Sequence, residues 1–326
     1  MSHFLSTVTH RHFERIGSTN TELIHAIAGG TLDHSTHHLY TADHQTAGRG
    51  QHGRTWVSGA DNVFLSLYVP LGKKAYQLHT LSGLLSLAVG LSLLDLPIIK
   101  TLNTARKKSA LPPIGVKWAN DIGYDAADGF KKLAGILIEP AFKKYDEKNT
   151  LAGVVIGVGL NVNHSPEIKD GLYQATCLKA LIPNNDLSDF ARPKMTAENE
   201  TAFYHSINSS QTDASTLSAH ALYTPMTNAL LTAVMQCNSL FNPTALTDFI
   251  TAFNHAHLLH NKQVQIFIQN NTTDIHTEGV CIGIGKTGEL LLDNDGHTTP
   301  VFAGMAKRPN YPQSHDLTCS PFKENS

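Results

Sequence analysis

The sequence predicts an α/β protein of the α+β type, in which a large domain is followed by a small β-domain. Up to about residue 258, short stretches rich in Val, Ile and Leu alternate with longer helical stretches. After that point, short apolar stretches follow one another, separated by turn sequences such as Asn-Asn and Asp-Asn-Asp-Gly. The 326 residues, 41% of them hydrophobic, are enough for one large core and a smaller one.

The first half of the chain is predicted to alternate between helix and strand. Residues 18–28 should be helical, with Ser18 as N-cap and Glu22 near the first turn. Strands are expected at residues 38–42, 62–70, 114–118, 132–139 and 153–163. The last two are joined by a polar turn and should form a hairpin. A helix at about 78–95 should be buried in the core, because Ser, Gly, Asp and Pro interrupt its apolar run too often for a membrane span.

The second half is predicted to contain an irregular segment, two helices and the β-domain. Residues 164–220 are rich in Pro, Asn, Asp and Ser and are interpreted as an insertion. Helices are expected at 222–240 and 243–258, followed by strands at 263–269, 276–284 and 289–293. We therefore expect a catalytic domain at 1–258, a small β-domain at 259–309 and a disordered tail at 310–326.

Bulk properties argue against several classes of protein. The formal net charge is -2, so no basic excess supports broad nucleic-acid binding. The four cysteines are widely spaced, and the N-terminus lacks the features of a signal peptide. These observations predict a cytoplasmic protein without a disulfide framework, a DNA partner or a membrane partner.

One segment, Gly48-Arg49-Gly50-Gln51-His52-Gly53-Arg54-Thr55-Trp56, concentrates glycine, arginine and tryptophan. Glycine allows a close approach of the backbone to a ligand, arginine suits carboxylates and phosphates, and tryptophan supplies a flat cover. The pattern predicts a loop that folds over an anionic ligand. It also fits the spacing of a dinucleotide-binding fingerprint, but the residues after Gly53 lack the helical character that this fingerprint requires.

Other polar clusters follow predicted strands. Lys117-Trp118-Ala119-Asn120-Asp121 ends one strand, where a lysine could clamp an anion. Asn161 and Asn163 end another and should point to the same side. By contrast, the histidines at 255, 257 and 260 lack an acidic partner, and we expect them to be ordinary surface residues.

In this order, the motifs resemble those of the biotin protein ligases. The resemblance is strong over about residues 13–163 and weaker in the C-terminal β-domain. The segments that carry it are Ser18-Thr19-Asn20, Gln45-Thr46-Ala47-Gly48-Arg49-Gly50, Gly53-Arg54-Thr55-Trp56, Lys117-Trp118-Ala119-Asn120-Asp121, Lys132-Leu133-Ala134-Gly135-Ile136-Leu137-Ile138-Glu139 and Gly157-Val158-Gly159-Leu160-Asn161-Val162-Asn163.

The resemblance implies a fold and a reaction. The fold is a catalytic domain like that of class II aminoacyl-tRNA synthetases and biotin synthetases, with a mixed sheet and an SH3-like C-terminal barrel. Biotin and MgATP would give biotinyl-5′-adenylate and pyrophosphate. A lysine of the biotin carboxyl carrier protein of acetyl-CoA carboxylase would then attack the adenylate. Mg²⁺ would arrive with ATP, its protein ligands remaining unassigned, and homodimerisation through the sheet would be compatible with the family.

The resemblance also implies roles for individual residues. Catalysis would rest on Lys117, Arg49 and Arg54. Biotin would be bound by Ser18, Thr19, Asn20, Gln45, Gly48, Arg49, Gly50, Gln51, Lys117 and Gly135. ATP and the adenylate would be bound by Arg54, Trp56, Asn120, Lys132 and Asn161.

Two residues depart from the family pattern. Gln51 stands where many members have arginine, which predicts less tight retention of the adenylate. Ala119 replaces the usual proline of Lys-Trp-Pro-Asn-Asp, which should loosen the turn slightly. With 17 residues before Ser18, too few for a DNA-binding domain, we expect a monofunctional ligase rather than a repressor. The remaining alternatives are a lipoate or octanoate ligase, whose Arg-Arg-x-Ser-Gly-Gly-Gly loop is missing here, and a non-catalytic biotin-binding regulator.

Overall fold

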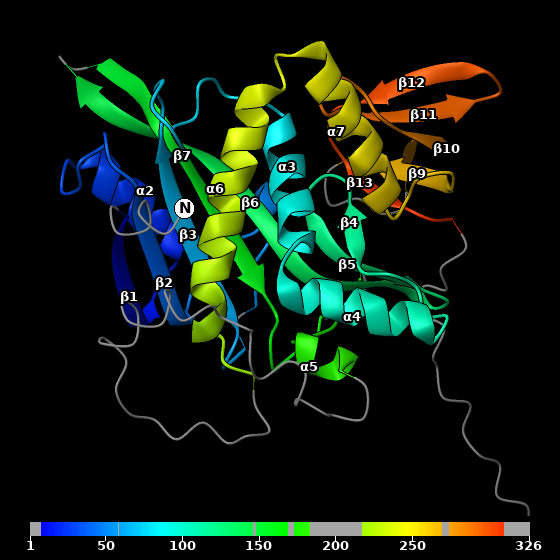
Figure 1. Ribbon diagram of the computed structural model, residues 1–326, viewed down its shortest axis with the longest axis horizontal. Coiled ribbons are helices and arrows are strands. Elements are labelled where there is room, and N and C mark those ends of the chain that lie inside the picture. Colours follow the sequence, from blue (N-terminus) through cyan, green and yellow to red (C-terminus); the bar gives the residue numbers. More distant parts are fainter. Residues whose placement is uncertain are drawn as a thin grey trace, which may run out of the picture.

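The computed structural model describes residues 8–57, 59–145, 148–168, 173–182, 217–268 and 274–309. They form a large mixed sheet, helices on both of its faces, and a smaller antiparallel sheet at one end (Figure 1). This arrangement confirms the predicted α+β fold with a C-terminal β-domain. The predicted insertion at 164–220 lies mostly outside the described residues, and the predicted tail at 310–326 lies wholly outside them.

The large sheet joins strands from the first half of the chain. Its order is β1 (Thr9–Ile16), β2 (His38–Gln45), β3 (Val63–Pro70), β7 (Lys148–Leu160), β6 (Gly129–Tyr145), β5 (Asp121–Ala126) and β4 (Gly115–Lys117). β1 and β2 are parallel, and the other neighbours along this order are antiparallel. The short β8 (Gln174–Ala175) pairs in parallel with β6. β6 and β7 form the predicted hairpin, which extends further than the apolar pattern indicated.

Helices cover the two faces unequally. α3 (Leu84–Leu94) and α6 (Tyr223–Ser239) pack on one face over the main core, whereas α2 (Thr19–Ala28) packs on the other (Figure 1). The other helices are α4 (Pro97–Lys108), α5 (Leu178–Leu181), α7 (Pro243–Ala256) and the short 3-10 turns η1 (Gln51–Gly53) and η4 (His220–Leu222). Of the helices described, none alone is both long and apolar enough to cross a membrane; α3 and α4 satisfy that test only as a pair bent by 69°.

The helix α2 begins where the sequence predicted. The Ser18 side chain accepts a hydrogen bond from the backbone N–H of Thr21 at 3.5 Å, which caps the first turn. Leu23 and Ile27, one turn apart, are fully buried against the sheet. The cap therefore fixes the start of α2 beside the strand ends, with Thr19 and Asn20 in its first turn.

The central strand β3 is buried on both faces. Val63, Leu65 and Leu67 belong to the core under α3 and α6, and Tyr68 belongs to the smaller core under α2. This explains why the strand has little polar character. Ser66 is the exception: it is fully buried although it is polar.

The short strand β4 pairs with β5 and packs closely against α3. A Cβ atom on Gly90 of α3 would lie 3.1 Å from Cγ1 of Val116, so glycine permits the contact. In the turn that follows, the Trp118–Ala119 peptide bond is cis, and the Ser86 hydroxyl donates to the Ala119 carbonyl at 3.0 Å. The end of β4 is thereby held against α3.

The C-terminal sheet is antiparallel and has the order β12 (His297–Val301), β11 (Leu290–Asn294), β10 (Ile275–Ile284), β9 (Gln263–Phe267) and β13 (Met305–Lys307). It is joined to the large domain by specific contacts. Trp118 Nε1 donates to the Gly288 carbonyl at 2.9 Å. The Asp125 carboxylate, which is almost buried, lies 2.6 Å from Lys262 Nζ and 2.8 Å from Arg308 Nη1. The small sheet thus sits directly beside the β4–β5 turn.

Several elements differ from the expectation. The core helix begins at Leu84 instead of 78, and its N-cap, Gly83, lies against the Thr287 carbonyl, 2.7 Å from where a Cβ would lie. The elements β1, α4, β5, β12 and β13 were not predicted. β1 is mostly exposed and carries hardly any apolar pattern. β5 begins at Asp121, inside the charged cluster that was expected only to end the preceding strand.

Candidate functional site

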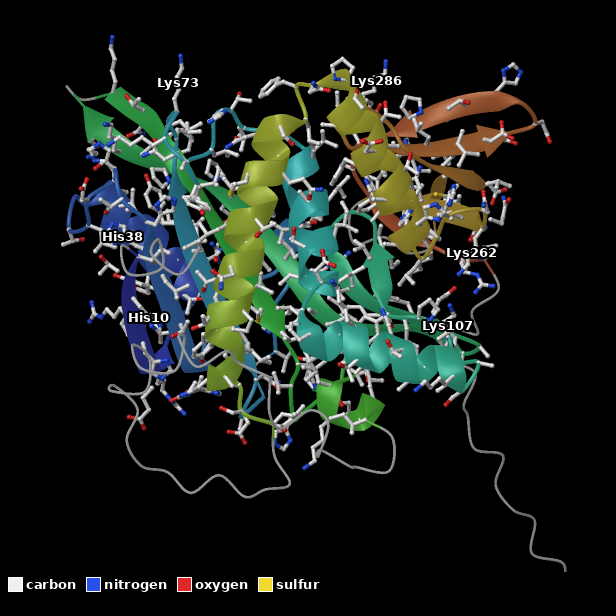
Figure 2. The ribbon with its side chains drawn as sticks, in the orientation of Figure 1. His10, His38, Lys73, Lys107, Lys262 and Lys286 are labelled. Carbon is white, nitrogen blue, oxygen red and sulfur yellow. The ribbon has the colours of Figure 1, made fainter. Side chains whose placement is uncertain are left out.

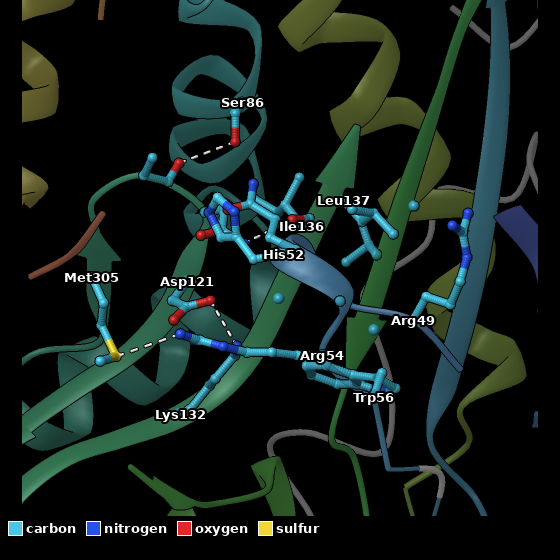
Figure 3. Close-up of a pocket in the computed structure, with 18 of the residues that line it drawn as sticks. Arg49, His52, Arg54, Trp56, Ser86, Asp121, Lys132, Ile136, Leu137 and Met305 are labelled. Atoms are coloured by element: carbon cyan, nitrogen blue, oxygen red, sulfur yellow. Dashed lines mark hydrogen bonds and ion pairs between the residues drawn. The ribbon is translucent and has the colours of Figure 1, made fainter. Parts of the chain in front are cut away.

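A cavity of about 690 Å³ opens where the ends of β2 and β4 and the middle of β6 meet the glycine-rich loop and the C-terminal sheet (Figure 3). Of the residues predicted to form the site, those that line the cavity are Ser18, Thr19, Asn20, Gln45, Arg49, Gly50, Gln51, Arg54, Trp56, Lys117, Asn120, Lys132 and Gly135. Motifs that are up to 117 positions apart in sequence therefore meet around one space.

The cavity is positively charged. Four of its lining side chains are lysine or arginine, namely Arg49, Arg54, Lys117 and Lys132, whereas Asp121 is the one carboxylate among the described residues that line it. Asp121 is already paired, because its Oδ1 lies 2.8 Å from Lys132 Nζ. A space lined by excess cations favours an anionic ligand.

Lys117 is the most deeply placed of these cations. Its side chain is buried, and its Nζ lies 4.7 Å from the centre of the Phe130 ring. Among the residues that the structure describes, no carboxylate lies within ion-pairing distance of it. Burial lowers the pKa of Lys117 to about 8, and Asp121 opposes this shift only in part. Most of the lysine is still protonated at neutral pH, so its uncompensated charge is available to a bound anion.

Two glycines on adjacent strands form a floor of the cavity, here called the glycine floor, beneath Trp56 of the glycine-rich loop. Gly135 of β6 and Gly159 of β7 are paired across the two strands. A Cβ on Gly159 would lie 2.4 Å from Cε2 of Trp56, and one on Gly135 would lie 2.9 Å from its Cζ3. The indole therefore rests on backbone where side chains are missing. Its Nε1 is buried without a hydrogen-bond partner among the described residues, and Lys132 Nζ lies 5.4 Å from the ring centre.

The α2 end of the cavity is polar and tightly hydrogen-bonded. Gln45 Oε1 accepts from the backbone N–H of Thr19 at 2.8 Å and from its hydroxyl at 3.1 Å. The buried Ser66 hydroxyl lies 2.8 Å from Thr19 Oγ1 and also contacts Asn20 Oδ1. A Cβ on Gly157 would lie 2.2 Å from that same amide oxygen, so Asn20 can occupy its place only over a glycine.

The glycine-rich loop is anchored by its arginines. Arg49 Nη2 lies 2.6 Å from Glu139 Oε2, which also accepts from Asn20 Nδ2 at 3.0 Å. Arg54 Nη2 reaches Met305 Sδ of the C-terminal sheet at 3.8 Å (Figure 3). The loop thereby spans the cavity from the large sheet to the C-terminal sheet.

Three predicted residues need comment. Asn120 lines the cavity, but its Nδ2 donates to the Ile136 carbonyl at 2.9 Å, so the amide also holds the turn. Asn161 does not line the cavity: it is buried and its Nδ2 donates to the Thr176 carbonyl at 3.0 Å. Gly48 does not line it either, and a Cβ there would lie 2.5 Å from the Trp56 carbonyl, so its glycine shapes the loop.

Part of the wall was not predicted. Residues 302–306 and Phe267 of the C-terminal sheet line the cavity, as do Ser66 and Tyr173. Ser66 could have been found from the sequence, because it is a single polar residue inside the apolar strand β3. The C-terminal loop has no comparable signal, since an exposed Phe302 in a turn looks like many others.

The expectation of surface histidines at 255, 257 and 260 is wrong for His257. This side chain is buried, its Nε2 accepts from the Trp118 backbone N–H at 3.3 Å, and its Nδ1 lies 3.8 Å from Cys281 Sγ. Burial lowers the pKa of His257 to about 3, so the ring stays neutral. The histidine supports the backbone next to Lys117.

Comparison with known proteins gives similarities that agree with one another. Residues 12–161 match the sequence model of the Biotin/lipoate A/B protein ligase family. The biotin–[acetyl-CoA-carboxylase] ligase of Mycobacterium tuberculosis is 41% identical over 160 residues, which cover 47% of this chain and 49% of the relative. The bifunctional ligase/repressor BirA of Escherichia coli is 26% identical over 265 residues, covering 81% of this chain and 64% of the relative. The chain thus spans about half the length of the first of these curated relatives.

A solved structure extends the likeness to the fold. The biotin protein ligase of Aquifex aeolicus, in complex with biotin and ATP, superimposes with a TM-score of 0.54, covering 91% of this chain and 97% of that one at 17% sequence identity. The matched segment contains the glycine-rich loop, Lys117 and the glycine floor, so sequence, fold and cavity agree. Residues 12–161 thus resemble the biotin/lipoate A/B protein ligase family in sequence, and the fold of the chain is similar to that of a biotin protein ligase.

Proposed function

We propose that this protein activates biotin with ATP and transfers it to a lysine of a biotin carboxyl carrier protein, such as that of acetyl-CoA carboxylase. The observation that carries the proposal is the buried, uncompensated ammonium of Lys117 inside a cavity with an excess of cations. Joining a carboxylate to an α-phosphate brings two anions together, which such a site stabilises more strongly than water does.

Chemically, the first step forms a mixed anhydride. A carboxylate oxygen of biotin attacks the α-phosphorus of ATP, and pyrophosphate leaves. Lys117 is proposed to contact both the carboxylate and the α-phosphate, with Arg49 and Arg54 neutralising the remaining charge. In the second step, a neutral lysine amine of the carrier attacks the carbonyl carbon, AMP leaves and an amide forms, so no nucleophile from this chain is needed.

The remaining roles follow the shape of the cavity. Ser18, Thr19, Asn20 and Gln45, together with Ser66, would surround the ureido ring of biotin. Trp56 would cover the adenylate above Gly135, with Asn120 and Lys132 on the nucleotide side and Asn161 acting from behind the cavity wall. Loop closure would exclude water from the anhydride.

Mg²⁺ would enter with the phosphates of ATP. The lining offers one carboxylate, Asp121, already 2.8 Å from Lys132 Nζ. A single paired carboxylate suits an ion that is held mainly by substrate phosphates and water.

The polar end of the cavity favours biotin over lipoate or octanoate. Thr19, Asn20, Gln45 and Ser66 place amide and hydroxyl groups where the end of the ligand would lie. The ureido ring of biotin both donates and accepts hydrogen bonds, whereas a dithiolane or methyl end would cover these groups without bonding them. Such unpaired polar groups penalise the wrong ligand strongly.

ATP–pyrophosphate exchange tests the proposal, run separately with biotin, lipoate and octanoate. We expect exchange with biotin alone, and its loss in Lys117→Ala. Lys131→Ala is the matched control, because Lys131 is a lysine of the same domain that lies outside the cavity lining and pairs with Asp128. Exchange with lipoate or octanoate only, or biotin binding without exchange, would overturn the proposal.

Transfer is tested by mixing the enzyme with a purified carrier domain and following the mass of its acceptor lysine. A Gln51→Arg variant extends the test, since it restores the charge common in the family. We expect it to retain the adenylate longer, seen as slower release of the adenylate in the absence of carrier.

A further inference from the structure

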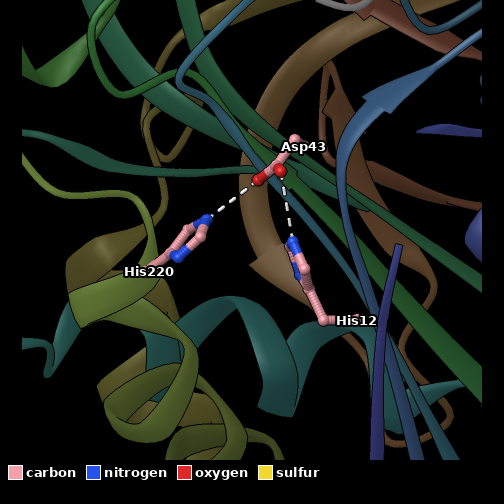
Figure 4. Close-up of side chains that lie close together, drawn as sticks. All are labelled: His12, Asp43 and His220. Atoms are coloured by element: carbon pink, nitrogen blue, oxygen red, sulfur yellow. Dashed lines mark hydrogen bonds and ion pairs between the residues drawn. The ribbon is translucent and has the colours of Figure 1, made fainter. Parts of the chain in front are cut away.

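A second cluster of chemically active side chains lies at the β1 edge of the sheet. His12 on β1, Asp43 on β2 and His220 on η4 point toward one another (Figure 4). None of the three lines the cavity described above. They come from three elements separated in sequence, so the fold itself brings them together.

Their geometry is that of a partial metal shell. Asp43 Oδ2 lies 3.2 Å from His12 Nε2, and Asp43 Oδ1 lies 2.8 Å from His220 Nε2. The potential ligand atoms of the cluster all lie within 4.8 Å of one another. Two ligands at about 2.0–2.1 Å from a tetrahedral zinc are about 3.3 Å apart, so small side-chain shifts bring these atoms to coordinating positions.

The surroundings orient His12 for such a role. His12 Nδ1 lies 2.9 Å from Thr41 Oγ1, and the same oxygen lies 2.8 Å from His10 Nε2. His10 lies at this edge of the sheet, two residues before His12 on β1 (Figure 2). Thr41 thus holds the His12 ring at Nδ1, the ring nitrogen that does not face Asp43.

The contact with Thr41 determines which way the His12 ring faces. With Nδ1 held by Thr41, the imidazole turns Nε2 toward Asp43, where it lies 3.2 Å from Oδ2. Metal-binding histidines characteristically have a neighbouring oxygen at their other ring nitrogen, and Thr41 Oγ1 occupies that position beside His12 Nδ1.

The environment admits a cation and solvent. The side chains of His12, Asp43 and His220 are 33%, 46% and 37% exposed, so water can complete the shell. Arg11, next to His12 on β1, lies instead over the Phe13 ring, 4.5 Å from its centre. The positive charge of Arg11 is thereby directed away from the cluster, because successive side chains of a strand point to opposite faces.

We propose that His12, Asp43 and His220 form a binding site for one divalent transition-metal ion, of which zinc fits best. Two imidazoles and one carboxylate suit zinc and its neighbours, whereas magnesium and calcium prefer shells made of oxygen. The ion ties the edge strand β1 and the segment before α6 to β2. It serves the stability of this edge and takes no part in adenylation.

Isothermal titration of the metal-free full chain with zinc chloride tests the site, with cobalt absorption spectra as a second readout. Wild type is expected to bind one ion that Asp43→Asn and His220→Ala each weaken by at least ~10-fold. His44→Ala is the matched control: it removes a histidine from the adjacent position of β2, on the opposite face. Circular dichroism verifies that each variant is folded.

Thermal unfolding gives an independent measurement. Zinc should raise the midpoint of wild type and of His44→Ala but leave that of Asp43→Asn unchanged, because only binding to the folded state shifts the midpoint. Absence of zinc binding in wild type, or equal affinity in folded Asp43→Asn and wild type, overturns the proposal. The cluster would then be a hydrogen-bonded clasp. Failure of biotin-dependent exchange would leave this result untouched.

Discussion

Lys117→Met removes the buried ammonium but keeps most of the volume of the side chain. The pKa of Lys117 falls from 10.5 to about 8, chiefly through burial. Since one pKa unit corresponds to about 1.4 kcal/mol, holding the charge in the folded protein costs about 3 kcal/mol at neutral pH. The free energy of unfolding of the variant should therefore exceed that of wild type by about 3 kcal/mol. The variant should also lose biotin-dependent exchange.

The lowered pKa of Lys117 also predicts how the stability difference between wild type and the variant changes with pH. Below about pH 8 the lysine is protonated in both folded and unfolded states, so the full penalty is present. Between about pH 8 and 10.5 the unfolded state keeps the proton while the folded state releases it, so wild type gains stability relative to the variant. The stability difference should fall from about 3 kcal/mol at pH 7 to about 1.4 kcal/mol at pH 9.5.

Urea unfolding at both pH values measures this difference, with tryptophan fluorescence as the signal. Lys73→Met is the control, because Lys73 is exposed at the surface (Figure 2) and its replacement should change stability by less than about 0.5 kcal/mol. A Lys117→Met protein that is less stable than wild type, or a difference that does not shrink with rising pH, would refute the reasoning.

Three further variants probe the cavity and its support. In Gly157→Ala, the new methyl displaces Asn20, so the KM for biotin in the exchange assay should rise about tenfold or more while the KM for ATP changes less. In Gly159→Ala, the methyl displaces the Trp56 indole, and kcat should fall by about 100-fold; an unchanged kcat would show that the indole does not cover the ligand. Below about pH 6.5 the unfolded state protonates His257 while the folded state does not, so stability falls with acidification. His257→Gln should flatten that fall by up to about 1.4 kcal/mol per pH unit in urea titrations, and an unchanged slope would contradict it.

Regular elements with strong patterns were predictable from the sequence. The apolar strand β3, the capped helix α2 and the β6–β7 hairpin all appear where their residues indicated. β1 was missed because its residues are mostly polar and exposed, and its place in the sheet depends on parallel pairing with β2. Such pairing is a tertiary contact that leaves no periodic trace in the strand itself.

For the site, the sequence indicated which motifs matter but not how their groups are partnered. Nothing in the motif around Glu139 revealed that its carboxylate restrains Arg49. The burial of His257 depends on packing between the two domains, which a local pattern of histidines does not contain. Asn161 is the opposite case: it belongs to a matched motif, yet it does not line the cavity and instead holds the Thr176 segment behind the cavity wall.

The hydrogen bond from Trp118 Nε1 to the Gly288 carbonyl limits where the chain can be truncated without loss of the cavity. The family match ends at residue 161, yet the wall formed by residues 302–306 and the acceptor for the indole N–H both lie beyond it. A fragment that keeps every matched motif would leave Trp118 without its acceptor and the cavity open on one side. The smallest working piece is therefore longer than the recognisable one, and any chimera that exchanges the C-terminal sheet has to supply a carbonyl at the position of Gly288.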